Sequence, residues 1–169
     1  MSDQPPVKAR YLPPMFNGVK DGSVVWKRIA DIDHELLGYF LTCHLLIEHY
    51  MDEYLKATLP QLDWEKPRLT FGQRINLLKW EVLVNDKKYD PIPAIKHMNT
   101  LRNKISHRLE IKLDMEALLP LLEYMQKVSH PNPYKSPVEP KELLEAFVGT
   151  CCATFASHLA FQYHRTSKV

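Results

Sequence analysis

The sequence predicts an all-α protein, a single-domain bundle of about five helices. Apolar residues recur at three- and four-residue steps over long stretches, which is typical of helices that bury one face. The chain has thirteen prolines but only five glycines, and most of the prolines cluster between longer proline-free runs, as in bundles with stiff connections. With 169 residues, of which 45% are hydrophobic, it can bury one core but is short for two.

The two ends of the chain differ in character. Residues 1–28 are rich in proline and glycine, and we predict that they form an irregular N-terminal tail. No stretch shows a convincing strand-like alternation, so no β-structure is expected. Residues 29–169 are predicted to form the helical bundle.

Two helices are predicted in the first half of the bundle. The apolar pattern indicates a long helix over 31–57, and Pro60 follows its end. Thr70 and Gln73 have the spacing of a capping box, which predicts a second helix beginning there and continuing through Val82.

Three further helices are predicted in the second half. The third begins near Pro91 or Pro93 and runs through about Leu109. The fourth is expected to begin at Asp114 as N-cap, with Pro120 kinking or shortening its first turns. The fifth begins near Pro140 and is apolar around much of its circumference, which suggests that it forms a homodimer interface.

Charge and cysteine content indicate a cytoplasmic protein. The net charge is only +2, but the segment from Lys66 to Lys112 carries +7, so the middle of the chain is basic and its flanks are acidic. The odd set of three cysteines implies no disulfide framework. The first residues do not have the pattern of a secretory signal, and no membrane span is expected.

The most informative chemistry lies on the third predicted helix, in Arg102-Asn103-Lys104-Ile105-Ser106-His107. Asn103 and His107 are four residues apart and share a helix face, with Arg102 on the adjoining edge. An imidazole that moves protons and a guanidinium that holds a phosphate are suited to metal-free phosphodiester cleavage. On spacing alone the simpler interpretation is a solvated face, with His107 interacting with the last carbonyls of the helix.

Together with the helices around it, this motif resembles the hallmark motif of the HEPN superfamily. The hallmark of that family is Arg-Asn-x-x-x-His near the end of a helix in a four- or five-helix bundle, and residues 102–107 match it without a departure. The neighbouring order is also similar: residues 45–48 in a long helix, residues 71–78 in a capped helix, and residues 98–101 leading into the motif. The resemblance covers about residues 30–128.

The resemblance implies a ribonuclease of the toxin or defence type, in which two protomers place both motifs in one cleft. By that likeness Arg102 binds the scissile phosphate, His107 acts as acid or base, and Asn103 orients it. The family often carries a polar or acidic residue on its first long helix facing the motif, and Glu48 is the candidate here. The alternative for Glu48 is a surface ion pair with a neighbouring Lys or Arg.

The basic residues around the motif are candidates for RNA binding. Lys96, Lys104 and Arg108 could follow a phosphate backbone, and a solvated face is the alternative explanation. No metal site is predicted, because His44 and Glu48 share a helix face but supply only two ligands. No cofactor-binding pattern is present, so none is expected.

Two functions follow as hypotheses. The first is a metal-independent endoribonuclease that acts as a homodimer, perhaps the toxin of a toxin–antitoxin pair with an antitoxin as protein partner. The second is a non-catalytic regulatory or protein-interaction module with the same fold, similar to the mannitol operon repressor branch of the superfamily.

Overall fold

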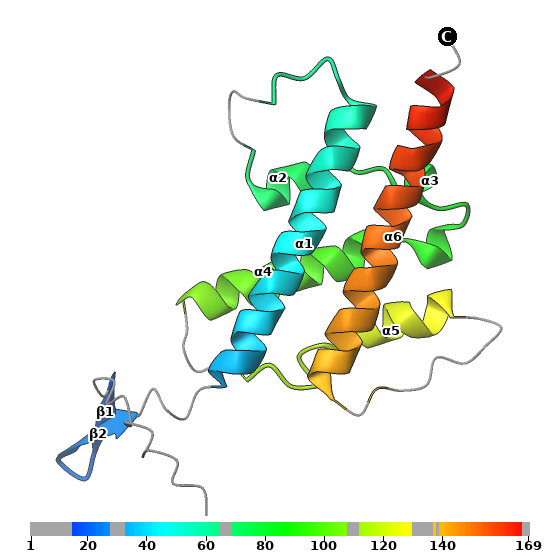
Figure 1. Cartoon of the computed structure of the whole chain (residues 1–169). Helices are drawn as coiled ribbons and strands as arrows, with labels where there is room; N and C mark the ends of the chain where they lie inside the picture. The colour runs from blue at the N-terminus through cyan, green and yellow to red at the C-terminus, as the bar shows by residue number, and fades with distance from the viewer. Residues whose placement is uncertain are drawn as a thin grey trace, which may run out of the picture. The chain divides into compact units, whose positions relative to one another are not determined.

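The computed structural model describes residues 15–27, 33–64, 69–107, 112–129, 137 and 139–166. The chain divides into two compact units, Met1–His34 and Glu35–Val169, each described here by itself. The second unit is helical, as predicted (Figure 1). The predicted boundary between tail and bundle, at residues 28 and 29, lies outside the described residues.

The first unit contains a β-hairpin, which corrects the expectation of an irregular tail without strands. Strand β1 (Met15–Lys20) pairs antiparallel with β2 (Ser23–Lys27). The two residues between them, Asp21 and Gly22, have φ angles of 51° and 77°. A two-residue loop with positive φ at both positions favours Asp-Gly, because it matches the twist of the flanking strands.

The strands themselves contain residues that favour β-structure. Val19 is the cross-strand partner of Val24, and Phe16 is the partner of Trp26 with the two rings edge to face at 6.5 Å. The register shifts between Phe16 and Val19, where Gly18 has a φ of 110°. This irregularity obscures the alternation that sequence inspection relies on.

Helices α1 (His34–Thr58) and α6 (Pro140–Thr166) lie side by side and run in the same direction (Figure 1). Their first turns are joined by Lys141, whose Nζ donates to Glu35 Oε1 at 2.9 Å. The predicted bounds of α1, 31–57, agree with the structure to within three residues, and the predicted start of α6 near Pro140 is confirmed.

Aromatic packing continues the contact between α1 and α6 toward their C-terminal ends. The Tyr54 ring of α1 lies 5.5 Å from the Phe155 ring and 5.9 Å from the His158 ring, measured between centroids. His158 also bonds through Nε2 to the carbonyl oxygen of Leu83 at 2.9 Å. This bond ties α6 to the segment that follows α2.

The predicted second helix is two short helices, α2 (Phe71–Ile75) and α3 (Trp80–Leu83). The capping box is confirmed, since the Thr70 hydroxyl accepts from the Gln73 N–H and the Gln73 side chain accepts from the Thr70 N–H. The expected continuation through Val82 is wrong.

The helix stops because its last turn tightens. The N–H groups of Asn76, Leu77 and Leu78 each donate to the carbonyl three residues earlier, a pattern that closes a helix end. The chain then bends, and the bend allows both Leu78 and Leu83 to be buried. Tertiary burial here outweighs the local helical pattern.

Helix α4 (Ile92–His107) carries the motif and crosses behind α1 and α6 in Figure 1. It follows the 3-10 helix η2 (Lys87–Tyr89), and Asp90 Oδ1 accepts from the Ile92 N–H at 2.8 Å. The predicted start at Pro91 or Pro93 is therefore confirmed. Residues 108–111, into which the helix was expected to continue, lie outside the described part.

Helix α5 (Leu119–Val128) begins later than Asp114, the predicted N-cap. Asp114 Oδ1 instead accepts from the Ala117 N–H at 3.0 Å in a turn that precedes the helix. Pro120 occupies the first turn of α5, where the missing N–H costs nothing. The expectation that this proline shortens the helix is confirmed.

The core of the helical unit is shared by α1, α4, α5 and α6. Its largest fully buried side chains are those of Phe40, Ile47, Met51, Leu55, Ile75, Ile95, Met98, Leu118, Leu121, Leu143, Phe147 and Phe155. The three cysteines are thiols, with Cys43 and Cys151 buried and Cys152 half-buried. Burial raises the pKa of the Cys43 thiol to about 11, so it is unreactive at neutral pH.

Within the described residues, α6 over Pro140–Tyr163 is long and apolar enough to cross a membrane by length and composition alone. A core helix of a soluble protein satisfies the same criterion. Leu143, Leu144 and Phe147 of this helix are all fully buried against the rest of the unit. The cytoplasmic location stays a prediction.

Two leucines of α5 offer a matched test of this core. Leu121 is fully buried and Leu119 is 47% exposed. We expect Leu121→Ala to lower the free energy of unfolding by about 2–5 kcal/mol, through lost burial and the cavity left behind, and Leu119→Ala by less than about 1 kcal/mol. Urea unfolding followed by circular dichroism measures both. Equal losses would contradict the described packing of α5.

Candidate functional site

The motif occupies the C-terminal half of α4. Ile95, Met98 and Leu101 are buried and Ile105 is half-buried, so these residues form the core face of the helix. Arg102, Asn103, Lys104, Ser106 and His107 are all exposed. The helix therefore buries one side and presents the polar groups of the motif to solvent.

Arg102 and Asn103 are held together. Arg102 Nη1 donates to Asn103 Oδ1 at 3.2 Å, and Ser106 Oγ donates to the Arg102 carbonyl at 2.9 Å. The resemblance implied that Asn103 orients His107, whereas the bond in the structure joins Asn103 to Arg102. A guanidinium has five N–H donors, so Arg102 keeps donors for a phosphate.

His107 is the last described residue of α4. The carbonyls of the final turn carry partial negative charge, which favours cations such as Lys104 and His107 there. The alternative interpretation of His107 as a helix-end cation is compatible with this position. The exposed imidazole of His107 is also open to a substrate.

A residue that sequence inspection did not assign to the site, His44 of α1, lies against the motif helix. Its side chain is only 3% exposed, and among the described residues its Nε2 is the one buried side-chain nitrogen or oxygen without a hydrogen-bond partner. The ring stacks on Phe71, the first residue of α2, with 4.2 Å between centroids.

The groups around His44 come from α4. Burial lowers the pKa of His44, a hydrogen bond with the Asn99 side chain opposes this, and the positive charge of Arg102 lowers the pKa further. The Asn99 amide also approaches Gly72, where an added Cβ would lie 3.9 Å from its nitrogen. His44 thus connects α1 and α2 to the motif through Asn99 and Arg102. Its position in an otherwise apolar helix stripe was the only sequence signal.

Glu48, the expected acidic partner of the motif, is bound to Arg74 of α2. Arg74 Nη1 lies 2.9 Å from Glu48 Oε1 and 2.7 Å from Asp52 Oδ2. All three side chains are largely shielded from solvent. The structure therefore places Glu48 in the ion pair that was the alternative interpretation. Burial raises the pKa of Asp52 despite the opposing effect of Arg74.

The predicted RNA-binding residues are only partly described. Lys96 and Lys104 are exposed on α4, and neither forms an ion pair with another described residue. Arg108 lies outside the described residues. Two exposed ammonium groups on the motif helix give it a positive surface.

Metal ligation has little support in the described part of the chain. No group of three or more His, Cys, Asp or Glu side chains gathers there in a way that could hold a metal ion. Of the one pair considered from sequence, Glu48 is paired with Arg74, and the His44 ring is stacked on Phe71. The motif itself presents a guanidinium, an amide and an imidazole that are all exposed on one helix.

Comparison of the chain with protein-family models, with curated proteins and with solved structures finds no match. The functional argument therefore depends on the residues of the site.

The burial of His44 has a measurable consequence for stability. Its folded-state pKa is below the ordinary value of about 6.5, so the unfolded chain binds the proton more readily. The stability that depends on an uncharged His44 is fully present above pH 6.5 and is lost as the pH falls below that value. We therefore expect the unfolding free energy of the wild type to decrease between pH 7.5 and 5 more steeply than that of His44→Leu, in urea titrations. His49→Leu, on an exposed part of α1, should keep the wild-type slope. Parallel curves for wild type and His44→Leu would refute the assignment.

Proposed function

We propose that this protein is an endoribonuclease of the HEPN type that cleaves without a metal ion. The observation that carries the proposal is the exposed Arg102, Asn103 and His107 set at the end of α4, which matches the family motif residue for residue. Exposure at a rigid helix end makes these side chains accessible to a phosphodiester while the buried face of α4 keeps them in place.

The reaction requires two proton transfers and stabilisation of charge on phosphorus. A base removes the proton of a ribose 2′-hydroxyl, the freed oxygen bonds to the adjacent phosphorus, and the 5′-oxygen leaves with a proton from an acid. In the proposal Arg102 holds the phosphate oxygens and His107 transfers a proton. The products are a 2′,3′-cyclic phosphate and a 5′-hydroxyl end.

Contacts within the chain support the proposed role of Arg102 in holding the phosphate. Asn103 accepts from Arg102, which limits the directions in which the guanidinium can point. Lys96 and Lys104 add positive charge along the same helix, where it attracts a phosphate backbone. His44, whose pKa is lowered by burial, contributes little positive charge behind Arg102 at neutral pH.

Self-association is part of the proposal, because one motif supplies a single histidine and the reaction uses both an acid and a base. Large apolar side chains are exposed on α1, where Leu45 is 62% and Leu46 is 44% exposed. Leu46, Tyr50 and Val148 also line an open groove of about 320 Å³ between α1 and α6. An exposed apolar surface of this kind favours a protein partner, and we expect a second copy there.

The second candidate is a regulatory or interaction module without catalysis. The ion pair between Glu48 and Arg74 favours it, since the acidic group expected near the motif is engaged elsewhere. An antitoxin or other regulatory partner in the cytoplasm is compatible with both functions.

Cleavage of single-stranded RNA by the purified full-length chain, with a chelator present, tests the proposal. We expect His107→Ala and Arg102→Ala each to lower the cleavage rate at least ~100-fold, as loss of a proton-transfer group or a phosphate clamp does. Lys112→Ala, an exposed lysine outside the motif, is the control. Oligonucleotides with a 2′-deoxy sugar at the cleaved position should resist. Equal activity in wild type and both motif variants, at matched thermal stability, would overturn the enzymatic proposal in favour of the second candidate.

The role of Glu48 is tested separately by comparison with its partner. If Glu48 acts by holding Arg74, Glu48→Gln and Arg74→Gln should each lower the unfolding free energy by about 1–3 kcal/mol, and a double-mutant cycle should give a favourable coupling of about 1 kcal/mol. Both variants should then reduce RNA cleavage to the same small extent. A cleavage defect in Glu48→Gln that far exceeds that of Arg74→Gln would show instead that Glu48 takes part in the chemistry.

A further inference from the structure

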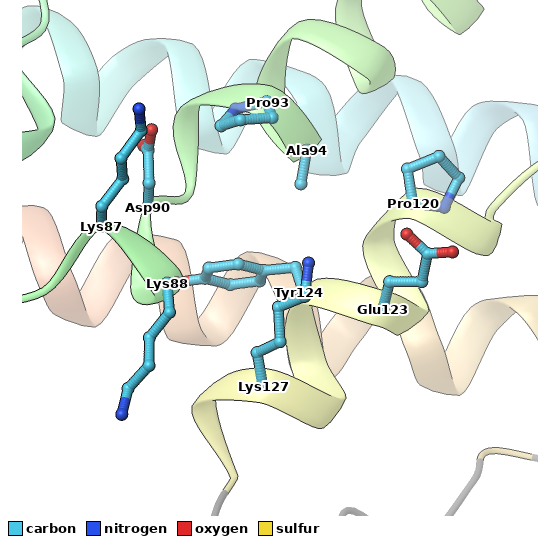
Figure 2. A pocket seen from close by; sticks show the side chains of 9 residues that line it. All are labelled: Lys87, Lys88, Asp90, Pro93, Ala94, Pro120, Glu123, Tyr124 and Lys127. Atoms are coloured by element: carbon cyan, nitrogen blue, oxygen red, sulfur yellow. The ribbon is translucent and has the colours of Figure 1, made fainter.

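A pocket of about 340 Å³ opens where η2, the first turn of α4 and α5 meet (Figure 2). It lies at the opposite end of α4 from the motif. Ala94, which lines the pocket, is separated from His107 by about 20 Å at 1.5 Å rise per residue. The pocket is therefore separate from the proposed ribonuclease site, and its function does not depend on that proposal.

The walls of the pocket are apolar and firmly held. Figure 2 shows the Tyr124 ring on one side and Pro93 and Ala94 on the other. Tyr124 is 5% exposed, and its ring packs edge to face on the buried Phe147 at 5.7 Å. A flat apolar body fits between such surfaces, because it replaces the water that they otherwise contact.

Cations surround this apolar space. Lys87 and Lys127 line it and form no ion pair with any described residue. Lys88 also lines it but is engaged, with its Nζ 3.5 Å from Asp86 Oδ2 and over the Tyr89 ring. Two ammonium groups are thus available to an anionic ligand.

The Tyr124 hydroxyl adds a donor. It makes no hydrogen bond with another residue in the described part of the chain, although the side chain is almost fully buried. Burial raises the pKa of this hydroxyl, and the nearby Cys151 and Asp90 raise it further, so it keeps its proton at neutral pH. The Tyr124 hydroxyl is not among the fully buried unpaired atoms of the described residues, so it is open to the pocket and can donate to an acceptor that enters there.

One helix end favours negative charge as well. Pro93 and Ala94 belong to the first turn of α4, so the positive end of this helix lies at the pocket, whereas α5 lines the pocket along its length from Pro120 to Lys127. The Ala94 N–H is one of the donors for which the helix itself supplies no acceptor.

Two carboxylates in the lining further restrict the kind of ligand that the pocket can bind. Asp90 uses Oδ1 to accept from the Ile92 N–H at 2.8 Å, whereas Glu123 lines the pocket without a partner among the described residues. Because Lys88 is paired with Asp86, the charges left in the lining are those of Lys87, Lys127, Asp90 and Glu123, and an anion can meet only the two lysines. Glu123 additionally favours a ligand that carries a hydrogen-bond donor.

We propose that this pocket binds a small organic anion, with an aromatic or similarly flat body, a carboxylate or phosphate group and a hydrogen-bond donor. The anionic group is placed against Lys87 or Lys127, whose ammonium groups lie on different sides of the Tyr124 ring in Figure 2. The flat body lies against the Tyr124 ring, and the donor meets Glu123.

Titration of the isotope-labelled full-length chain by nuclear magnetic resonance tests this inference. Phenyl phosphate and 4-aminobenzoate are the anionic probes, and 4-aminobenzamide is a neutral analogue of the second. We expect saturable shifts of the Ala94, Tyr124 and Lys127 amide signals with at least one anionic probe. The neutral analogue should bind about tenfold or more weakly, since it forms no charge-assisted hydrogen bonds. The tighter of the two anionic probes identifies phosphate or carboxylate as the preferred group.

Variants distinguish specific binding in the pocket from non-specific attraction of the probe to positive charge. The double variant Lys87→Gln, Lys127→Gln should weaken binding of the better probe about tenfold or more, and Tyr124→Phe should weaken it by a smaller factor. Lys79→Gln combined with Lys112→Gln removes the same charge elsewhere and should leave binding unchanged. The inference is overturned by an absence of saturable binding, by equal affinity for 4-aminobenzamide and 4-aminobenzoate, or by equal weakening in the two double variants.

Discussion

The burial of one face of α4 is the constraint on which the rest of the structure depends. Ile95, Met98 and Leu101 enter the core, and their burial determines the rotation of the helix. This rotation fixes the directions in which the motif side chains point, because each successive residue is rotated by about 100° about the helix axis. The same rotation directs Ala94 into the pocket with η2 and α5. Both candidate sites of the molecule are consequences of how this helix is packed.

A second set of contacts keeps α4 in register with α1. Helix α2 is too short to be stable by itself, and it is held by its capping box and by the pairing of Arg74 with Glu48 and Asp52. Its first residue, Phe71, covers His44, which in turn meets Asn99 of α4. We therefore expect substitutions at this corner to affect the position of the motif helix, although these residues do not belong to the motif. A polar group left incompletely satisfied in such a position is unusual in a native core.

Sequence inspection recovered the helices whose apolar period is long, namely α1, α4 and α6, because periodicity averages over several turns. It failed where local and tertiary preferences compete. The segment around Asn76 has a helical pattern, but burial of Leu78 and Leu83 bends it. The hairpin was missed because its strands are short and irregular at Gly18, although Asp21-Gly22 is a turn signal with a clear physical cause. The position of the motif was predictable from helix geometry. The contact of His44 with α4 depends on how separate helices cross, and no local pattern encodes that.

The parallel arrangement of α1 and α6 has a consequence for how the chain acquires its structure. Glu35 and Lys141 meet although they are 106 positions apart in the sequence, so this pairing closes a very long loop. Neighbouring helices that run in opposite directions need only a short connection, whereas these two are joined through every other helix of the unit. Closing so long a loop costs chain entropy, so we expect the contact between α1 and α6 to form late, after the intervening helices have begun to pack. During synthesis the side of α1 that packs on α6 is therefore covered only once α6 has been made, after all the helices between them.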